Sequence, residues 1–222
     1  MPTLITPDTR LSDVITRDPS TVTVLSRFGL RLGVGDLTVS GICRSRGINT
    51  ALLTTILNTF LYEDYVPETA MIPSVTSELV DYLSQTNDYY ERFLLPNIER
   101  HFQLLIGKSS GNNNLQLMLQ FFHEVKQQLL ERINDDRTRW QSGKLKNNPE
   151  DQHLSTEADN DTIEDKINDL VNMMVIHLQG DYDANLALAV LHAIVSLKKD
   201  ITQNNRIRKR ILHPLHHALT HQ

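Results

Sequence analysis

The sequence predicts an all-α protein. Four long stretches repeat apolar residues with a roughly helical period, at about 76–106, 114–140, 161–178 and 183–219. Residues 1–62 hold shorter helical patterns, and no stretch shows the alternation of apolar and polar residues that is typical of a strand. We therefore expect a small helical N-terminal module followed by a four-helix bundle.

Composition excludes several classes of protein. The 222 residues are 40% hydrophobic and carry a net charge of −5, which gives no general electrostatic reason to bind nucleic acid or an acidic membrane surface. Cys43 is the single cysteine, so an internal disulfide and a Cys-rich metal site are excluded. No apolar run reaches the roughly 18 residues that span a bilayer, and no secretory signal opens the sequence. We expect a cytoplasmic protein without a membrane partner.

The first 62 residues contain helix starts and stops. Asp18-Pro19-Ser20 has an N-cap residue followed by proline at the first helical position, and Gly29 is placed to end that helix. Thr38 caps a second helix, which Gly47 ends. Because these short helices bury little core, we expect the module to lean on the main body or on a second copy of itself.

Residues 63–75 contain two prolines between polar residues and are predicted to form a linker. In the long helix that follows, Pro96 should introduce a kink or divide the helix in two. Its inward side chains are predicted to be Leu79, Leu83, Tyr90, Phe93, Leu94, Ile98, Phe102 and Leu105.

A polar segment, 141–160, separates the second long helix from the third, and we expect it to be a mobile crossover. The helix at 161–178 opens with capping-box spacing, with Asp in the cap, and Gly180 ends it.

In the last helix, Asn204 and Arg208 lie four residues apart and so share one face. That spacing can build a metal site in a bundle, but an amide and a guanidinium are unsuited to binding iron.

Three stretches resemble hemerythrin-like (HHE cation-binding) domains. They read Leu-Leu-Pro96-Asn-Ile, then Phe122-His-Glu-Val with Leu-Leu-Glu-Arg132-Ile-Asn-Asp-Asp136, and then Lys199-Asp200-Ile through to Ile-Leu-His-Pro214. Residues 1–62, with the run Arg27-Phe-Gly-Leu-Arg-Leu-Gly-Val-Gly-Asp-Leu-Thr-Val-Ser-Gly-Ile-Cys43, resemble the small domain that precedes the bundle in iron–sulfur cluster repair di-iron proteins. The resemblance implies a bundle, residues 76–222, that holds two irons through histidines and bridging carboxylates in nitrosative or oxidative stress.

The sequence departs from that pattern at the implied ligand positions. The former ligand positions, expected to line the bundle cavity, are Asp88, Asn112, Arg132, Asp136, Glu164, Asn204 and Arg208. Gly33-Val34 replaces the usual Cys-Cys pair of the small domain. A protonated guanidinium cannot coordinate a metal ion and repels it, so we expect no metal and no cofactor. Instead, Arg132 and Arg208 would pair with the carboxylates of Asp88, Asp136 and Glu164; a partial metal site from those three carboxylates is the alternative.

Other candidates have simpler explanations. The C-terminal histidines could hold a surface zinc or nickel ion, but a polar helix face is the simpler explanation; they are His213, His216, His217 and His221. The basic run of the last helix could contact nucleic acid, but a solvated face is the simpler explanation. Cys43 is either a reactive thiol or, more simply, a small buried hydrophobe.

The sequence lacks a Gly-rich phosphate loop and a Ser/His/Asp arrangement, so we expect no enzyme. The expected function is that of a non-enzymatic hemerythrin-like protein without a di-iron centre, which serves as a regulatory or protein-interaction scaffold and docks a partner or self-associates. Two alternatives stay open: an iron-binding stress-response protein with atypical ligands, and a sensor of a small ligand held in the former metal cavity.

Overall fold

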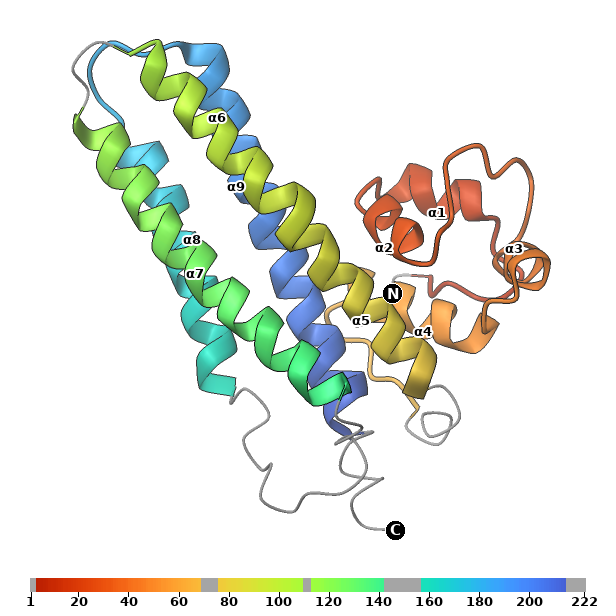
Figure 1. Ribbon diagram of the computed structural model, residues 1–222. Helices are drawn as coiled ribbons and strands as arrows, with labels where there is room; N and C mark the ends of the chain where they lie inside the picture. The colour runs from red at the N-terminus through yellow and green to blue at the C-terminus, as the bar shows by residue number, and fades with distance from the viewer. Residues whose placement is uncertain (1–2, 69–75, 110–112, 142–156, 215–222) are drawn as a thin grey trace. The chain divides into compact units, whose positions relative to one another are not determined.

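The computed structural model describes residues 3–68, 76–109, 113–141 and 157–214, and within these ranges the protein is helical and contains no strand (Figure 1). Contacts divide the described chain into two compact units. Unit 1 holds the residues up to Thr86 together with those from Gln203 onward, and unit 2 holds those from Asn87 to Thr202. The domain boundaries predicted at 62 and 76 stay predictions, and most of the 141–160 crossover lies outside the described residues.

Unit 1 begins with four short helices. They are α1 (Leu11–Arg17), α2 (Thr21–Arg27), α3 (Val39–Arg46) and α4 (Thr50–Leu61), and α5 (Thr76–Tyr89) follows. The predicted ends of α3 are confirmed, because Thr38 Oγ1 accepts a hydrogen bond from the Gly41 amide at 3.1 Å and Gly47 takes a left-handed conformation with φ of +67°. The carboxylate of Asp18 accepts two hydrogen bonds from Ser20 and so closes the turn before α2.

The core of unit 1 gathers apolar side chains from all four short helices. These are Leu11, Val14, Val24, Leu25, Val39, Ile42, Cys43, Leu53, Ile56, Leu57 and Phe60. The buried amide of Asn58 holds the chain before α1 against α4, since Oδ1 accepts from the Ile5 amide and Nδ2 donates to the Ile5 carbonyl, both at 2.8 Å.

The last described turns of the chain cap the C-terminal end of α4. Gln203 Nε2 donates to the Phe60 carbonyl at 3.1 Å, and Arg210 Nη1 donates to the Tyr65 carbonyl at 2.6 Å. The last carbonyls of a helix lack partners within the helix, and its C-terminal end attracts cations. These bonds therefore tie the end of α4 and the residues after it to the last described turns of the chain, within unit 1.

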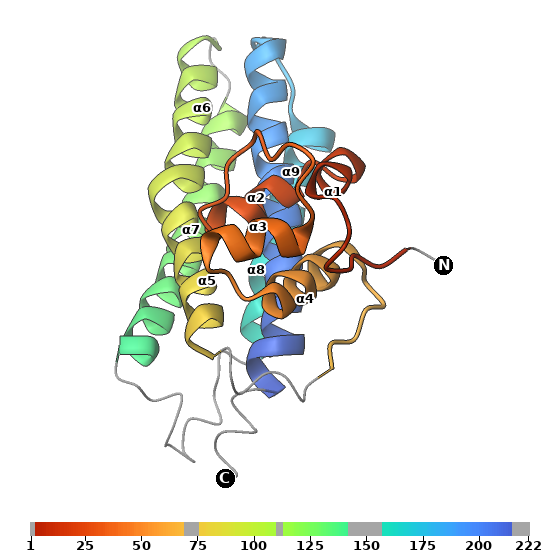
Figure 2. The same cartoon turned by 90° about the vertical axis from the view of Figure 1, so that its right-hand side faces the viewer.

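Unit 2 consists of four helical segments that run alongside one another in both views (Figures 1 and 2). They are η3 with α6 (Tyr90–Leu94 and Leu95–Gly107), α7 (Asn113–Gln141), α8 (Glu157–His177) and α9 (Ala184–Ile207) as far as Thr202. All four contribute to one apolar core, which includes Ile98, Phe102, Phe122, Leu129, Ile133, Ile167, Leu170, Val190, Ile194 and Ile201.

Two π-helical segments interrupt the long helices, and each precedes a proline. The segment η3 lies two residues before Pro96, and η4 (Arg208–Leu212) lies two residues before Pro214. In each, the amide five residues on donates to the first carbonyl, from Leu95 to Tyr90 and from His213 to Arg208. Proline has no N–H to continue an α-helical ladder, and a wider turn accommodates the gap. The predicted division at Pro96 is therefore confirmed.

The wider turn also changes which side chains face inward. A π-turn inserts about one extra residue into the helical repeat, so the faces before and after it no longer follow a single α-helical register. Phe93, predicted to point inward, is 65% exposed, whereas Tyr90 and Leu94 on either side are buried. The prediction for Phe93 was wrong because it assumed an uninterrupted α-helical period.

Candidate functional site

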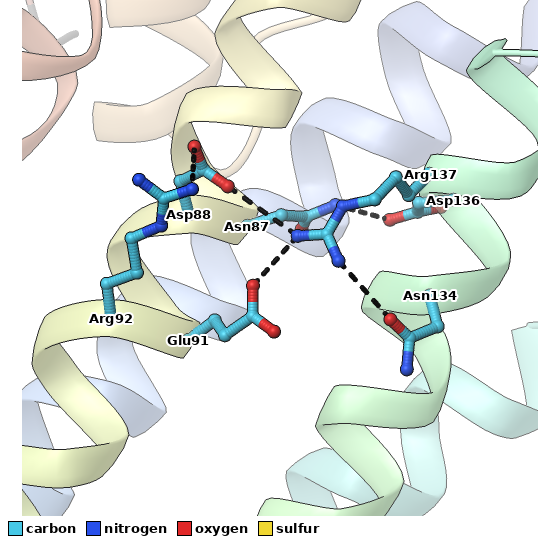
Figure 3. A network of polar contacts seen from close by, with 7 residues as sticks. All are labelled: Asn87, Asp88, Glu91, Arg92, Asn134, Asp136 and Arg137. Carbon is cyan, nitrogen blue, oxygen red and sulfur yellow. Dashed lines mark hydrogen bonds and ion pairs between the residues drawn. The ribbon is translucent and has the colours of Figure 1, made fainter.

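The candidate site in unit 2 is built on α7, where Arg132 and Asp136 lie four residues apart and project from the same face. Both are withdrawn from water, with 5% and 7% of their surfaces exposed. Charged groups tolerate such burial only when they are paired and hydrogen-bonded. Asn87, which is also buried, supplies one of the hydrogen bonds to Asp136: its Nδ2 donates to Asp136 Oδ2 at 2.9 Å (Figure 3).

A second layer of charges lies next to this pair, centred on Arg137. Its Nη2 atom lies 2.8 Å from Glu91 Oε2 and 3.6 Å from Asp88 Oδ1, while Nη1 donates to Asn134 at 3.3 Å (Figure 3). Its bond to Glu91, and in smaller measure the charge of Asp88, raise the pKa of Arg137 above its ordinary value. Because each ion-pair partner in this layer is at least a third exposed, the layer contributes modestly to stability.

Asp88 lies in this outer layer, away from the position expected for it. Its side chain is 36% exposed and forms ion pairs with Arg92 and Arg137. In that turn the buried residue is Asn87, and the sequence alone did not single it out. Adjacent residues on a helix point about 100° apart, so a displacement of one position moves a side chain from the interior to the rim.

Glu164 is partly buried on α8 and accepts a hydrogen bond from Thr202 Oγ1 on α9 at 2.6 Å. Asn112 lies outside the described residues. Within the described ranges, no group of three or more His, Cys, Asp or Glu side chains is placed to hold a metal ion.

The end of α9 and the start of η4 carry a run of buried polar residues in unit 1. Asn204 is wholly buried and Arg208 is 3% exposed, and Gln203 and Asn205 beside them are also buried. Among the residues described, neither side-chain polar atom of Asn204 has a hydrogen-bond partner. A buried amide without partners costs about 1–3 kcal/mol, and such a group in a native structure requires a reason.

Two of the described histidines, His101 and His123, have side-chain contacts near the surface of unit 2. His101 Nδ1 lies 2.8 Å from the Asn97 carbonyl, and His123 Nε2 lies 2.9 Å from Glu99 Oε1. His177 and His192 are exposed, and His213 is partly buried. The C-terminal histidines 216, 217 and 221 lie outside the described residues, so neither explanation given for them is tested.

Burial decides between the two roles suggested for Cys43. The thiol is fully buried in unit 1, and that burial raises its pKa. Thiolate is the reactive form, so a raised pKa and burial together make Cys43 a packing residue.

Comparisons with protein families, with curated proteins and with solved structures find no match to this chain. Among the described residues, no helix is both long and apolar enough to cross a membrane.

Proposed function

We propose that the chain is a hemerythrin-type four-helix protein in which polar and ionic side chains replace the metal, and that it acts as a non-enzymatic binding or regulatory scaffold. The observation that carries the proposal is the burial of Arg132 and Arg208, two of the implied ligand positions. Guanidinium groups cannot coordinate iron, and a buried positive charge opposes a bound cation. The side chains at these positions therefore do not fit a di-iron centre.

The arrangement on α7 supports the same proposal. Asp136, the carboxylate that a metal would require, accepts instead a hydrogen bond from Asn87. An amide donor satisfies a buried carboxylate without a metal. The polar groups of this helix thus serve packing and specificity of the bundle.

Exposed apolar side chains near the helix ends of unit 2 support a role in protein contacts. They are Leu104, Leu117, Val175, Ile176, Tyr182 and Leu188, close to the α6–α7 and α8–α9 connections. A partner, or a second copy of the chain, that covered these side chains would remove their apolar surface from water. Light scattering across a concentration series tests the second of these.

Metal analysis tests the proposal directly. The full chain, expressed in iron-rich medium and purified without chelator, should hold far less than one iron and show no oxo-bridged absorption. About two irons per chain would instead identify an iron-binding stress-response protein with atypical ligands. A sample unfolded and refolded with ferrous iron under argon controls for failure of loading in the cell.

The unpartnered amide of Asn204 favours a second candidate, a small-ligand sensor. A polar ligand that reached this amide would satisfy both of its polar atoms. Asn204→Leu removes the amide at similar volume. It should abolish any thermal shift caused by such a ligand; a shift that survives in Asn204→Leu would contradict this second candidate.

A further inference from the structure

Unit 1 contains a pocket of ligand size that is unrelated to the former metal positions. Its volume is 530 Å³, within the range of roughly 300–1,000 Å³ that small-molecule sites occupy. Three segments line it: the end of α2 from Ser26 to Gly29, the turn between α3 and α4 with Leu52, and one face of α5. All of them belong to the same compact unit.

A positive charge is fixed in the wall of this pocket. Arg27 is only 6% exposed, its Nη1 donates to Tyr82 Oη at 3.3 Å, and its guanidinium carbon lies 5.8 Å from the centre of the Tyr82 ring. Tyr82 is itself buried, so the guanidinium is held against a rigid aromatic surface. A planar guanidinium with five N–H donors suits a carboxylate better than any other side chain does.

The beginning of α4 adds to the attraction for an anion. Ile48 and Asn49 line the pocket directly before this helix of 12 residues. The first turn of a helix carries partial positive charge and amides that lack intrahelical partners. Asn49 Oδ1 accepts from the Leu52 amide, which fixes that turn in place at the edge of the pocket.

The opposite charge comes from α5. Glu78 and Asp81 both line the pocket and lie three residues apart, hence on one helix face. Two carboxylates against one guanidinium give the lining a formal charge of −1. The carboxylates of Glu78 and Asp81 would repel a simple anion. A ligand that also carries an ammonium group would complement both the acidic and the basic side of the pocket.

An apolar surface completes the pocket. The rings of Phe28 and Tyr82 pack at a centroid distance of 5.1 Å, and Ile48 and Leu52 add aliphatic surface. A ligand with an apolar side chain next to its charged groups would bury that side chain here.

We propose that this pocket binds a small zwitterion, a free amino acid or a dipeptide, with its carboxylate against Arg27 and the start of α4 and its ammonium against Asp81 and Glu78. The proposal is independent of the absence of iron, because none of the pocket residues is an implied metal ligand.

The test uses the full chain and three probes that share one side chain: phenylalanine, phenethylamine and 3-phenylpropionate. The same measurement of Tm is then made with the other amino acids and with dipeptides that contain the amino acid that binds best. A matching zwitterion at ten times its Kd should raise Tm by about 3–6 °C. Each analogue that lacks one charge should bind at least about tenfold more weakly by calorimetry. Comparing the affinity of the dipeptides with that of the free amino acids shows which of these two kinds of ligand the pocket binds more tightly.

Substitutions place the ligand in the pocket. Asp81→Asn should weaken binding of the zwitterion about tenfold, while Asp13→Asn on α1, outside the pocket, should leave it unchanged. Arg27→Lys keeps the charge but loses the planar fork, and should weaken binding of the carboxylate. Should Arg27→Lys fail to fold, Glu78→Gln supplies, after Asp81→Asn, a second substitution at an exposed position of the pocket lining. Equal binding of the amine or the acid alone, equal binding by Asp81→Asn, or no binding of any amino acid or dipeptide at about 10 mM would overturn the proposal.

Discussion

Asn87 Nδ2 donates a hydrogen bond to Asp136 Oδ2 across 2.9 Å and so joins the end of α5 to α7. Both side chains are almost wholly withdrawn from water. A carboxylate in such a place costs several kcal/mol unless donors surround it, so this bond matters more than the exposed ion pairs beside it. It also occupies a carboxylate oxygen at a position where the resemblance implies a metal ligand.

We expect Asn87→Ala to lower the free energy of unfolding by about 1.5–3 kcal/mol, because it removes a donor to a buried carboxylate. Asn134→Ala is the matched control, since Asn134 is exposed and contacts only the outer layer of charges. Its cost should stay below about 0.5 kcal/mol. Urea unfolding measures both, and equal losses in the two variants would contradict the prediction.

The ion pair between Arg137 and Glu91 should be weaker and sensitive to salt. A double-mutant cycle with Arg137→Met and Glu91→Gln should give a coupling energy of about 0.5–1 kcal/mol, because both side chains are partly exposed. The coupling should fall when the salt concentration rises from low values to about 1 M, as the Debye length shortens to about 3 Å. A coupling above roughly 2 kcal/mol, or one unchanged by salt, would show that the pair is shielded from solvent.

The sequence predicted local structure well because local structure depends on neighbouring residues. The cap at Thr38 and the stop at Gly47 are set by residues within one turn, and the division at Pro96 follows from a missing N–H. The π-helical character of that division, and with it the exposure of Phe93, depends on how the helix packs. Period alone could not predict it.

The site was harder to predict, because burial of a polar residue depends on one step of rotation about the helix. The resemblance places Arg132 and Asp136 in the interior of the bundle, and both side chains are buried. On α5 the same resemblance, counted back from Pro96, selected Asp88, whereas Asn87 is the buried residue. The contacts of Arg137 join residues 46 and 49 positions apart in sequence, and no pattern within either helix signals them.

Acid should weaken one contact between α6 and α7. Glu99 accepts a hydrogen bond from Lys126 Nζ at 2.6 Å and lies 2.9 Å from His123 Nε2, and the Lys126 bond in particular lowers the pKa of Glu99. A carboxyl whose pKa is lower in the folded state stabilises the fold above its unfolded pKa of about 4.3, and this stabilisation is lost as pH falls through the folded pKa.

Glu99→Gln should therefore be less stable than the unmodified chain at pH 7, by at most about 1 kcal/mol, and the difference should shrink below about pH 4. Glu124→Gln, at an exposed position of α7, provides the control, with little difference at either pH. Denaturant unfolding at several pH values measures the three proteins. A difference for Glu99→Gln that grows toward acid pH would contradict the assignment.

Arg210 should contribute to the stability of unit 1 through the Tyr65 carbonyl after α4. Arg210→Met keeps the aliphatic length but removes the donor, and should cost about 1–2 kcal/mol. Arg44→Met, at an exposed position of α3, should change the free energy of unfolding by less than about 0.5 kcal/mol. If Arg210→Met also costs nothing, the basic residues of this helix would be available for another role, and binding of nucleic acid would then merit measurement.

Restoring two metal ligands on the last helix should not restore iron. The double variant Asn204→His with Arg208→Glu places a histidine and a carboxylate four residues apart, as a bundle metal site requires. We nevertheless expect less than about 0.1 iron per chain, because the resemblance places the buried guanidinium of Arg132 in the same site, where it repels a cation. Adding Arg132→His should raise iron uptake above that of the double variant, and Arg137→His, five residues further along on the outer layer, should not. Circular dichroism of each variant separates failure to bind from failure to fold. Tight iron uptake by the double variant alone would show that charge at Arg132 never blocked the site.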